Sequence, residues 1–290
     1  MRAPRTALGP ASRVRKNQPL GSAAVERPDR NRKAGTKPPP RGSIAPQRLR
    51  RSTLSHRISR VHEHVLHDIL QQLRDAAHDV GRPVPRLLAV SKTQDETAVA
   101  NLALQGQDAF GENYVQEAAG KRAAMAATAV AGRALEWHLI GHLQSNKAAE
   151  AAALFDWVHT VDRPKLVAAL ARHRGADAPL NVLIQVNIDD EASKHGCRPD
   201  EVPALAAAIA AEPALRLRGL MVIPTPHAEP EQRRPSFRRA KALFDALAAD
   251  RAGVDTLSMG MSDDFAIAIA EGATLVRIGT ALFGARARPA

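Results

Sequence analysis

The stretch Arg86-Leu87-Leu88-Ala89-Val90-Ser91-Lys92 places a lysine directly after a short apolar run. Apolar runs of this length, bounded by polar residues, are typical of buried strands. Seven similar runs follow in the chain, so the candidate strands are Leu87–Ser91, Asp108–Gly111, Leu135–Ile140, Trp157–Val161, Asn181–Ile188, Leu217–Ile223, Thr256–Gly260 and Leu275–Gly279.

Amphipathic, alanine-rich segments separate these strands, among them Asp95–Leu104, Lys165–His173, Val202–Ala211 and Arg238–Ala249. Repeated alternation of strand and helix predicts a parallel sheet. Eight such units in a chain of 290 residues predict an α/β fold, a single (β/α)8 TIM barrel. An open, doubly wound sheet is the alternative.

The first part of the chain differs in composition from the rest. Residues 1–51 carry fourteen Lys and Arg against two acidic residues, a net charge of +12, whereas the whole chain has a net charge of +11. Because this stretch is also rich in Pro, Gly and Ser, we expect residues 1–52 to form a disordered basic extension and residues 53–290 to form the barrel. The extension has several interpretations: a weak polyanion-binding tail, a transit peptide, a product of a misplaced start site, or an appendage without a dedicated role.

The remaining residues have a net charge of −1, which argues against specific nucleic-acid binding by the barrel. The single cysteine, Cys197, excludes an internal disulfide and favours a reducing, cytoplasmic compartment. A helical apolar pattern from Ile58 to Leu73, with Ser55 as a candidate N-cap, carries His64 and His67 on one face. No third ligand accompanies that pair, so we expect no metal site, and no apolar run is long enough to predict a membrane span.

Active sites of such barrels lie at the C-terminal ends of the strands. Lys92 follows the first strand, where partial desolvation favours a neutral amine that condenses with an aldehyde; an ordinary loop lysine is the alternative. The last two strands lead into Ser262 and into Gly279-Thr280, which have the small side chains, hydroxyls and approachable backbone that bind phosphate. Taken singly, turn glycines and helix caps explain these residues equally well.

From about Ser55 to Arg286, the chain resembles the pyridoxal phosphate homeostasis protein family, whose barrels are similar to the N-terminal domain of alanine racemases. Six blocks in the expected order carry the resemblance: Ala89–Lys92, Gly111–Tyr114, Trp137–Lys147, Arg218–Met221, Ser258–Asp264 and Arg277–Thr280.

The resemblance implies that pyridoxal 5′-phosphate (PLP) is the cofactor and that Lys92 holds it as a Schiff base. Further cofactor-binding residues implied by it are Asn113, Met259, Ser262, Arg277, Gly279 and Thr280. Arg277 is implied to face the pyridine nitrogen, where a permanent cation weakens the cofactor as an electron sink. A core role explains Met259 equally well.

Other residues near the expected mouth receive ordinary interpretations. We interpret His138 and His142 as core or loop histidines rather than proton donors, and we expect Lys194 in solvent. Asp263 and Asp264 open a helix, where carboxylates complement the helix dipole.

The resemblance implies a non-catalytic PLP carrier in cofactor homeostasis, with PLP and apo PLP-dependent enzymes as partners. The alternative is a weak PLP-dependent amino-acid racemase. Racemisation needs an acid/base group on each face of the substrate, and alanine racemases use a tyrosine from a second domain of the partner subunit for one of them. Nothing in the sequence places the only tyrosine, Tyr114, opposite Lys92. Because the chain has no room for that second domain, we expect a monomer.

Overall fold

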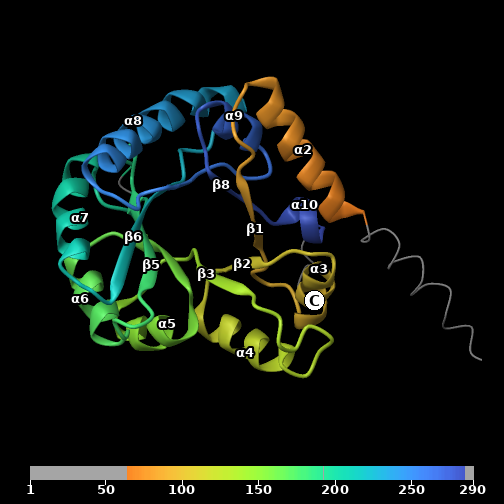
Figure 1. Cartoon of the computed structure of the whole chain (residues 1–290). Helices are drawn as coiled ribbons and strands as arrows, with labels where there is room; N and C mark the ends of the chain where they lie inside the picture. The colour runs from red at the N-terminus through yellow and green to blue at the C-terminus, as the bar shows by residue number, and fades with distance from the viewer. Residues whose placement is uncertain (1–63, 192, 285–290) are drawn as a thin grey trace, which may run out of the picture. The chain divides into compact units, whose positions relative to one another are not determined.

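A computed structural model describes residues 64–191 and 193–284. The expected basic extension, residues 1–52, and the candidate cap Ser55 lie outside the described residues. Eight parallel strands form a closed barrel in chain order (Figure 1): β1 (Arg86–Val90), β2 (Ala109–Glu112), β3 (Glu136–Leu139), β4 (Trp157–Val161), β5 (Leu180–Val186), β6 (Leu215–Val222), β7 (Thr256–Ser258) and β8 (Leu275–Ile278).

The barrel closes where β1 pairs with β8, with Leu88 opposite Arg277 and Ala89 opposite Ile278. This pairing confirms the predicted TIM barrel and excludes the open, doubly wound sheet. Each predicted strand is present, with ends that differ from the predictions by two residues or fewer.

Helices surround the barrel on its outside (Figure 1): α2 (Val65–Asp79), α3 (Glu96–Leu104), α4 (Val115–Met125), α5 (Ala148–Leu154), α6 (Pro164–Arg172), α7 (Val202–Ala210), α8 (Arg234–Asp250), α9 (Phe265–Ala270) and α10 (Thr280–Phe283). Short 3-10 turns precede three of them: η1 (Ser145–Lys147), η2 (Pro199–Glu201) and η3 (Pro230–Arg233). Helix α8 starts four residues before the predicted Arg238, because Pro235 lies in the first turn, where proline needs no N–H partner.

Two kinds of apolar packing hold the structure together. One large cluster fills the layer between the sheet and the helices, and residues such as Leu87 and Ala89 contribute to it from β1. Two small clusters fill the barrel itself: Leu88, Ala109 and Leu275 form one, and Trp157, Leu183 and Met221 form the other. Because neighbouring strand residues point to opposite faces, Leu88 and Leu275 lie inside the barrel while Leu87 and Val276 lie outside it.

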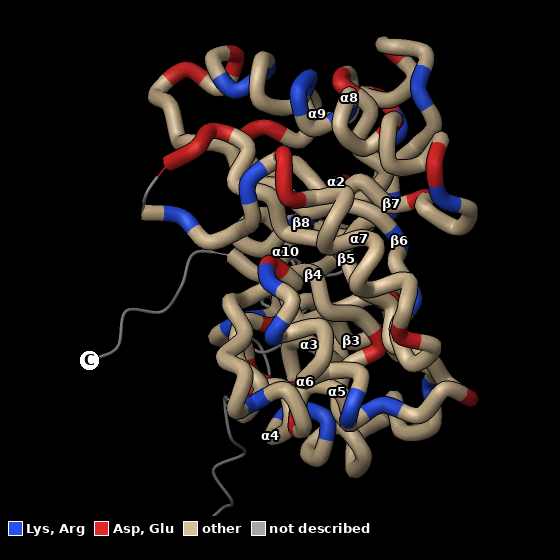
Figure 2. Tube along the Cα trace, turned by 90° about the vertical axis from the view of Figure 1, so that its left-hand side faces the viewer, with Lys and Arg blue, Asp and Glu red and all other residues tan. Residues whose placement is uncertain are grey.

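The charged residues of the described chain are interspersed by sign, with Lys/Arg and Asp/Glu mixed along the helices and loops (Figure 2). This mixing agrees with the small net charge that the sequence gives for the chain outside its basic extension. Among the described residues, no helix combines the length and the apolar character needed to cross a membrane.

Candidate functional site

The predicted cofactor-binding residues gather around four consecutive strands of the barrel. Strand β7 pairs with β8, β8 with β1, and β1 with β2, so the C-terminal ends of these strands are neighbours. Each predicted residue either follows one of these strands or, for Arg277, lies within β8, and the full set is Lys92, Asn113, Met259, Ser262, Arg277, Gly279 and Thr280. The topology therefore places all of them on, or directly after, these four neighbouring strands.

A buried hydrogen-bond network fixes the end of β1 just before Lys92. The Lys121 ammonium on α4 donates to the Ser91 carbonyl oxygen at 2.6 Å and to Glu112 Oε1 at 2.7 Å. The Ser91 hydroxyl donates to the same Glu112 oxygen at 2.6 Å. Lys121 is 6% exposed and Glu112 is fully buried, so this ion pair lies in the protein interior. Lys92, itself half-buried, thus extends from a rigid support.

The turn after Lys92 is held by the same helix. Thr93 adopts a left-handed backbone conformation with φ of 64°, which is uncommon for a non-glycine residue. Its N–H donates to Glu117 Oε1, and Lys121 donates to that oxygen as well, at 2.7 Å. These contacts stabilise an unfavourable backbone turn next to a functional candidate, as is common at binding sites.

The Glu112 carboxylate carries an electrostatic cost despite its bonds. Burial raises the pKa of Glu112, and the hydrogen bonds from Lys121 and Ser91 oppose that rise only in part. Its second oxygen, Oε2, is buried and has no hydrogen-bond partner among the described residues. No sequence pattern predicts this network, because Lys121 and Glu112 meet only when α4 packs on the barrel.

Arg277 extends from β8 into the barrel and is 5% exposed. Its guanidinium donates to the Ser258 carbonyl oxygen at 2.8 Å, to the Ser258 hydroxyl at 2.7 Å and to the Val222 carbonyl oxygen at 2.9 Å. Burial lowers the pKa of Arg277 to about 10, which leaves it protonated at neutral pH. A guanidinium has five N–H donors, so these bonds leave two for a ligand.

The loop after β7 is folded back on itself by Asp264. This carboxylate accepts a hydrogen bond from the Met261 N–H at 2.7 Å and one from Arg233 Nη1 at 2.7 Å. It makes no side-chain cap bond to α9, so its main contacts hold the loop that carries Ser262. Gly260 begins the loop with φ of 90°, a conformation that side chains disfavour.

Met259 is fully buried in the large apolar cluster that includes the outward-facing strand residues. This burial agrees with the core role that the sequence left open as its alternative.

The loop after β8 lies directly against the end of β1. Gly279 caps α10, and a Cβ atom added to it would lie 3.1 Å from the Val90 carbonyl oxygen. Glycine therefore allows the backbone that starts α10 to approach the end of β1, two residues before Lys92. Helix α10 begins at Thr280, so the N–H groups of its first turn have no partner within the helix.

The interior of the barrel holds a histidine pair that includes one residue the sequence analysis missed. His138 Nδ1 lies 2.9 Å from His159 Nε2, both rings are fully buried, and His138 stacks on Trp157. Burial lowers the pKa of His138 and holds the pKa of His159 well below its usual range, so both rings are neutral. His138 is thus a core histidine, as expected. Trp157 and His159 are separated by one residue in β4, a spacing that could have identified His159 as facing inward.

Buried polar atoms without partners provide a test of whether a polar ligand fits this barrel. Among the described residues, His159 Nδ1 and Gln185 Oε1 are buried and lack any hydrogen-bond partner. Unsatisfied buried polar atoms are rare unless a ligand or water binds them. The barrel interior therefore has hydrogen-bonding capacity for a polar ligand, from Arg277 on β8 and from these two atoms on β4 and β5.

The other side of the mouth contains two residues singled out by the sequence. Lys194 is not in solvent as expected: its ammonium lies 2.9 Å from Glu191 Oε2 and 3.3 Å from the Thr225 hydroxyl, and its side chain is 21% exposed. The His142 side chain is 31% exposed, and its pKa is lowered by partial burial of the ring and by the neighbouring His195.

Residues 65–287 match the family of alanine racemase N-terminal domains. The pyridoxal phosphate homeostasis protein of Pseudomonas aeruginosa is 51% identical over 221 residues, which cover 75% of this chain and 93% of that protein. The protein of the same name from Escherichia coli is 48% identical over 226 residues, covering 77% of this chain and 96% of that protein.

Solved structures agree with these matches. The structure of PipY from Synechococcus elongatus with PLP bound superposes with a TM-score of 0.66 at 34% identity, covering 77% of this chain and 99% of PipY. An alanine racemase from Corynebacterium glutamicum, at 21% identity and a TM-score of 0.54, shares the fold. This chain therefore belongs to the pyridoxal phosphate homeostasis protein family, within the wider family of alanine racemase N-terminal domains.

Proposed function

We propose that this chain binds PLP as a Schiff base on Lys92 and holds the reactive aldehyde as part of cofactor homeostasis. The names of its relatives and the PLP-bound structure of PipY support the choice of cofactor. The observation that carries the proposal is the close approach of the Gly279 backbone to Val90, where an added Cβ would lie 3.1 Å from the Val90 carbonyl oxygen, because the loop after β8 then lies next to the strand that leads into Lys92. PLP carries its aldehyde and its phosphate arm on neighbouring ring positions, so a lysine and phosphate donors have to be adjacent.

In this proposal, separate residues at the mouth bind the phosphate and the ring of the cofactor. The phosphate is held by the hydroxyls of Ser262 and Thr280 and by the backbone at Gly279, at the start of α10. Arg277 directs its remaining N–H donors at the pyridine nitrogen, Asn113 borders the ring from the end of β2, and Met259 supports the pocket from the core.

We further propose that the chain acts as a carrier rather than a catalyst. Bound PLP supplies an aldehyde that condenses with amines and a ring that acts as an electron sink. The permanent charge of Arg277 weakens that sink, because a cation disfavours protonation of the ring nitrogen. Tyr114 is 64% exposed, at the start of α4, and is therefore a poor candidate for a second acid/base group. The expected partners are PLP itself and apo PLP-dependent enzymes, with the chain acting as a cytoplasmic monomer.

Absorption spectroscopy tests the Schiff base. Wild-type protein with added PLP is expected to show a band at about 420 nm that borohydride bleaches, as any PLP–lysine Schiff base does. Lys92→Ala is expected to abolish the band. Lys165→Ala is the matched control, because Lys165 is an exposed lysine in α6 whose loss should leave the spectrum unchanged.

Two outcomes would contradict this proposal. If wild-type protein shows no band at saturating PLP, or Lys92→Ala keeps the full band, the assignment of Lys92 is wrong. Amino-acid racemisation by the PLP-loaded protein, abolished by Lys92→Ala, would replace the carrier role with a weak racemase.

A further inference from the structure

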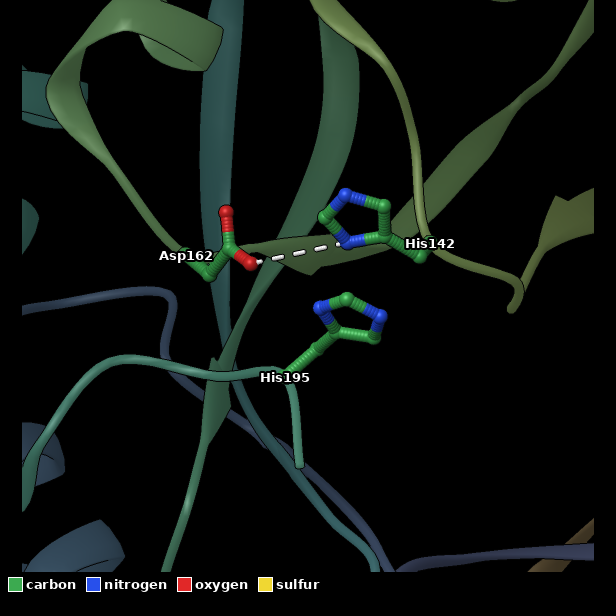
Figure 3. Close-up of side chains that lie close together, drawn as sticks. All are labelled: His142, Asp162 and His195. Atoms are coloured by element: carbon green, nitrogen blue, oxygen red, sulfur yellow. Dashed lines mark ion pairs between the residues drawn. The ribbon is translucent and has the colours of Figure 1, made fainter. Parts of the chain in front are cut away.

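Three potential metal ligands meet at the barrel mouth, after β3, β4 and β5. His142 follows β3, Asp162 follows β4, and His195 lies in the loop after β5, so three consecutive strands bring them together. Figure 3 shows the two imidazoles stacked on each other, with a ring nitrogen of each on the side of Asp162.

The donor atoms of this group are close to one another. His142 Nδ1 lies 3.8 Å from Asp162 Oδ2, the two ring centroids are 3.8 Å apart, and one donor atom from each residue lies within 4.8 Å of the other two. Nitrogen and oxygen ligands about 2.0–2.1 Å from a tetrahedral Zn²⁺ are about 3.3 Å from each other. The three donors therefore need to approach by at most about 1.5 Å to share one ion.

Hydrogen bonds from the barrel hold the backbone at both histidines. The Thr160 hydroxyl of β4 donates to the Gly141 carbonyl oxygen at 2.9 Å, which fixes the peptide just before His142. The Gln185 side chain of β5 donates to the His195 carbonyl oxygen at 3.2 Å. The rings themselves are exposed, so they turn about their side-chain bonds without disturbing the core.

Asp162 is oriented by the residue that follows it. The Arg163 guanidinium pairs with Asp162 Oδ1 and donates to the Leu143 carbonyl oxygen at 2.8 Å. This arrangement leaves Oδ2 as the oxygen that faces His142, on a side chain that is only 9% exposed. Outer contacts of this kind orient carboxylate ligands in metal sites.

We propose that His142, Asp162 and His195 bind a divalent transition-metal ion such as Zn²⁺ at the barrel mouth. Two imidazoles and one carboxylate are a common ligand set for such ions and leave a fourth position open for water or another ligand. Because each imidazole binds a metal in the plane of its ring, the stacked rings turn apart when the ion enters. The nearby Arg163 charge offsets that of Asp162, so the expected affinity is below that of a structural zinc site with four protein ligands.

No metal site was expected from the sequence, where only His64 and His67 share a helix face. Here the three ligands come from separate loops, and only closure of the barrel brings them together. The proposal does not depend on PLP binding, and the two can be tested separately.

Calorimetric titration of the full-length protein with Zn²⁺, in the absence of PLP, tests the site. PLP is left out because it also chelates divalent metals. Wild-type protein is expected to bind one Zn²⁺ per chain at this site, and His142→Ala, His195→Ala and Asp162→Asn are each expected to weaken that binding at least about tenfold. His227→Ala is the control, since His227 is an exposed loop histidine outside the group.

Cobalt substitution provides a readout that depends on the ligands themselves. Co²⁺ bound in a site of low coordination number gives visible absorption bands. Each of the three variants should lack these bands, and His227→Ala should retain them. The absence of saturable Zn²⁺ binding, or equal affinity in wild type and all three variants, would overturn the proposal. Because both histidines are exposed, their substitution leaves the fold intact, so loss of binding reports on the site.

Discussion

The two sides of the barrel mouth hold their polar side chains in different ways. On the side of β1 and β2, Lys121 and Glu112 form a buried ion pair whose members also bond the backbone or hydroxyl of Ser91. On the side of β3 to β5, His142 and His195 are exposed and contact each other only by stacking. A buried network fixes one geometry, whereas an exposed pair is free to rearrange around a ligand. The barrel mouth therefore holds a preformed arrangement next to Lys92 and an adaptable one after β3 to β5.

Among the substitutions considered, removal of Lys121 should lower the free energy of unfolding most. Lys121→Met leaves the Glu112 carboxylate buried without its cation and removes a donor from the Ser91 carbonyl oxygen. We expect the free energy of unfolding to fall by about 3–5 kcal/mol, the usual cost of removing one partner of a buried ion pair. Urea denaturation of the PLP-free protein measures this change.

Lys147→Met is the matched control for that experiment. Lys147 also lies 2.7 Å from a carboxylate, that of Glu150, but both side chains are partly exposed to solvent, at 36% and 51%. Its loss should change the free energy of unfolding by less than about 1 kcal/mol. Equal effects of the two substitutions would show that burial does not distinguish the two ion pairs.

Replacing Arg277 should have the next largest effect. Arg277→Gln removes the charge and most of the donors that bond Ser258 and Val222 inside the barrel. Buried acceptors that lose their donors cost about 1–3 kcal/mol, so we expect a loss of about 2 kcal/mol in the free energy of unfolding. Arg277→Lys keeps the charge, so its free energy of unfolding should fall less than that of Arg277→Gln. The prediction is wrong if Arg277→Gln is as stable as wild type in urea.

Acidification should lower the free energy of unfolding by a smaller amount, because Glu136 becomes protonated. The hydrogen bond with His138, together with the neighbouring Arg86, lowers the pKa of Glu136 from 4.5 to about 2. A carboxylate with a lowered pKa in the folded state stabilises the protein above its unfolded pKa. That contribution is lost as the pH falls from about 4.5 to about 2.

The magnitude of this effect is limited, because Glu136 is 39% exposed and solvent screens its charge. We expect less than about 1 kcal/mol. Urea midpoints measured across this pH range should fall less steeply for Glu136→Gln than for wild type. Parallel pH profiles for the two proteins would contradict the assignment.

The sequence was sufficient to predict the barrel and the positions of the candidate cofactor ligands. Apolar runs are local signals, and chain order alone places Lys92 and Gly279 at the ends of strands that pair when the barrel closes. The support around Lys92 could not be predicted in this way. Lys121 lies beside Arg122 in α4, where a lysine is ordinarily expected to face solvent. Its contact with Glu112 depends on how α4 packs against the barrel.

The same limit explains the remaining differences. His159 is recognisable only once the inward face of β4 is known. Lys194 was expected in solvent because its contact with the Thr225 hydroxyl requires the loops after β5 and β6 to meet, although its pair with Glu191 is local. Contacts between loops depend on tertiary geometry, whereas strand assignment depends on local pattern.

The smallest expected effect concerns the stability of the adaptable side. His142→Ala and His195→Ala each remove an exposed ring whose main partner is the other ring, so the free energy of unfolding in metal-free buffer should change by no more than about 0.5 kcal/mol. In the presence of Zn²⁺, wild-type protein should gain stability because an ion that binds only the folded state stabilises it, and both variants should lack that gain. Thermal unfolding with and without Zn²⁺ measures both quantities. A large loss of stability without metal would mean that the histidine stack is a structural element, and the two sides of the mouth would then differ in burial but not in rigidity.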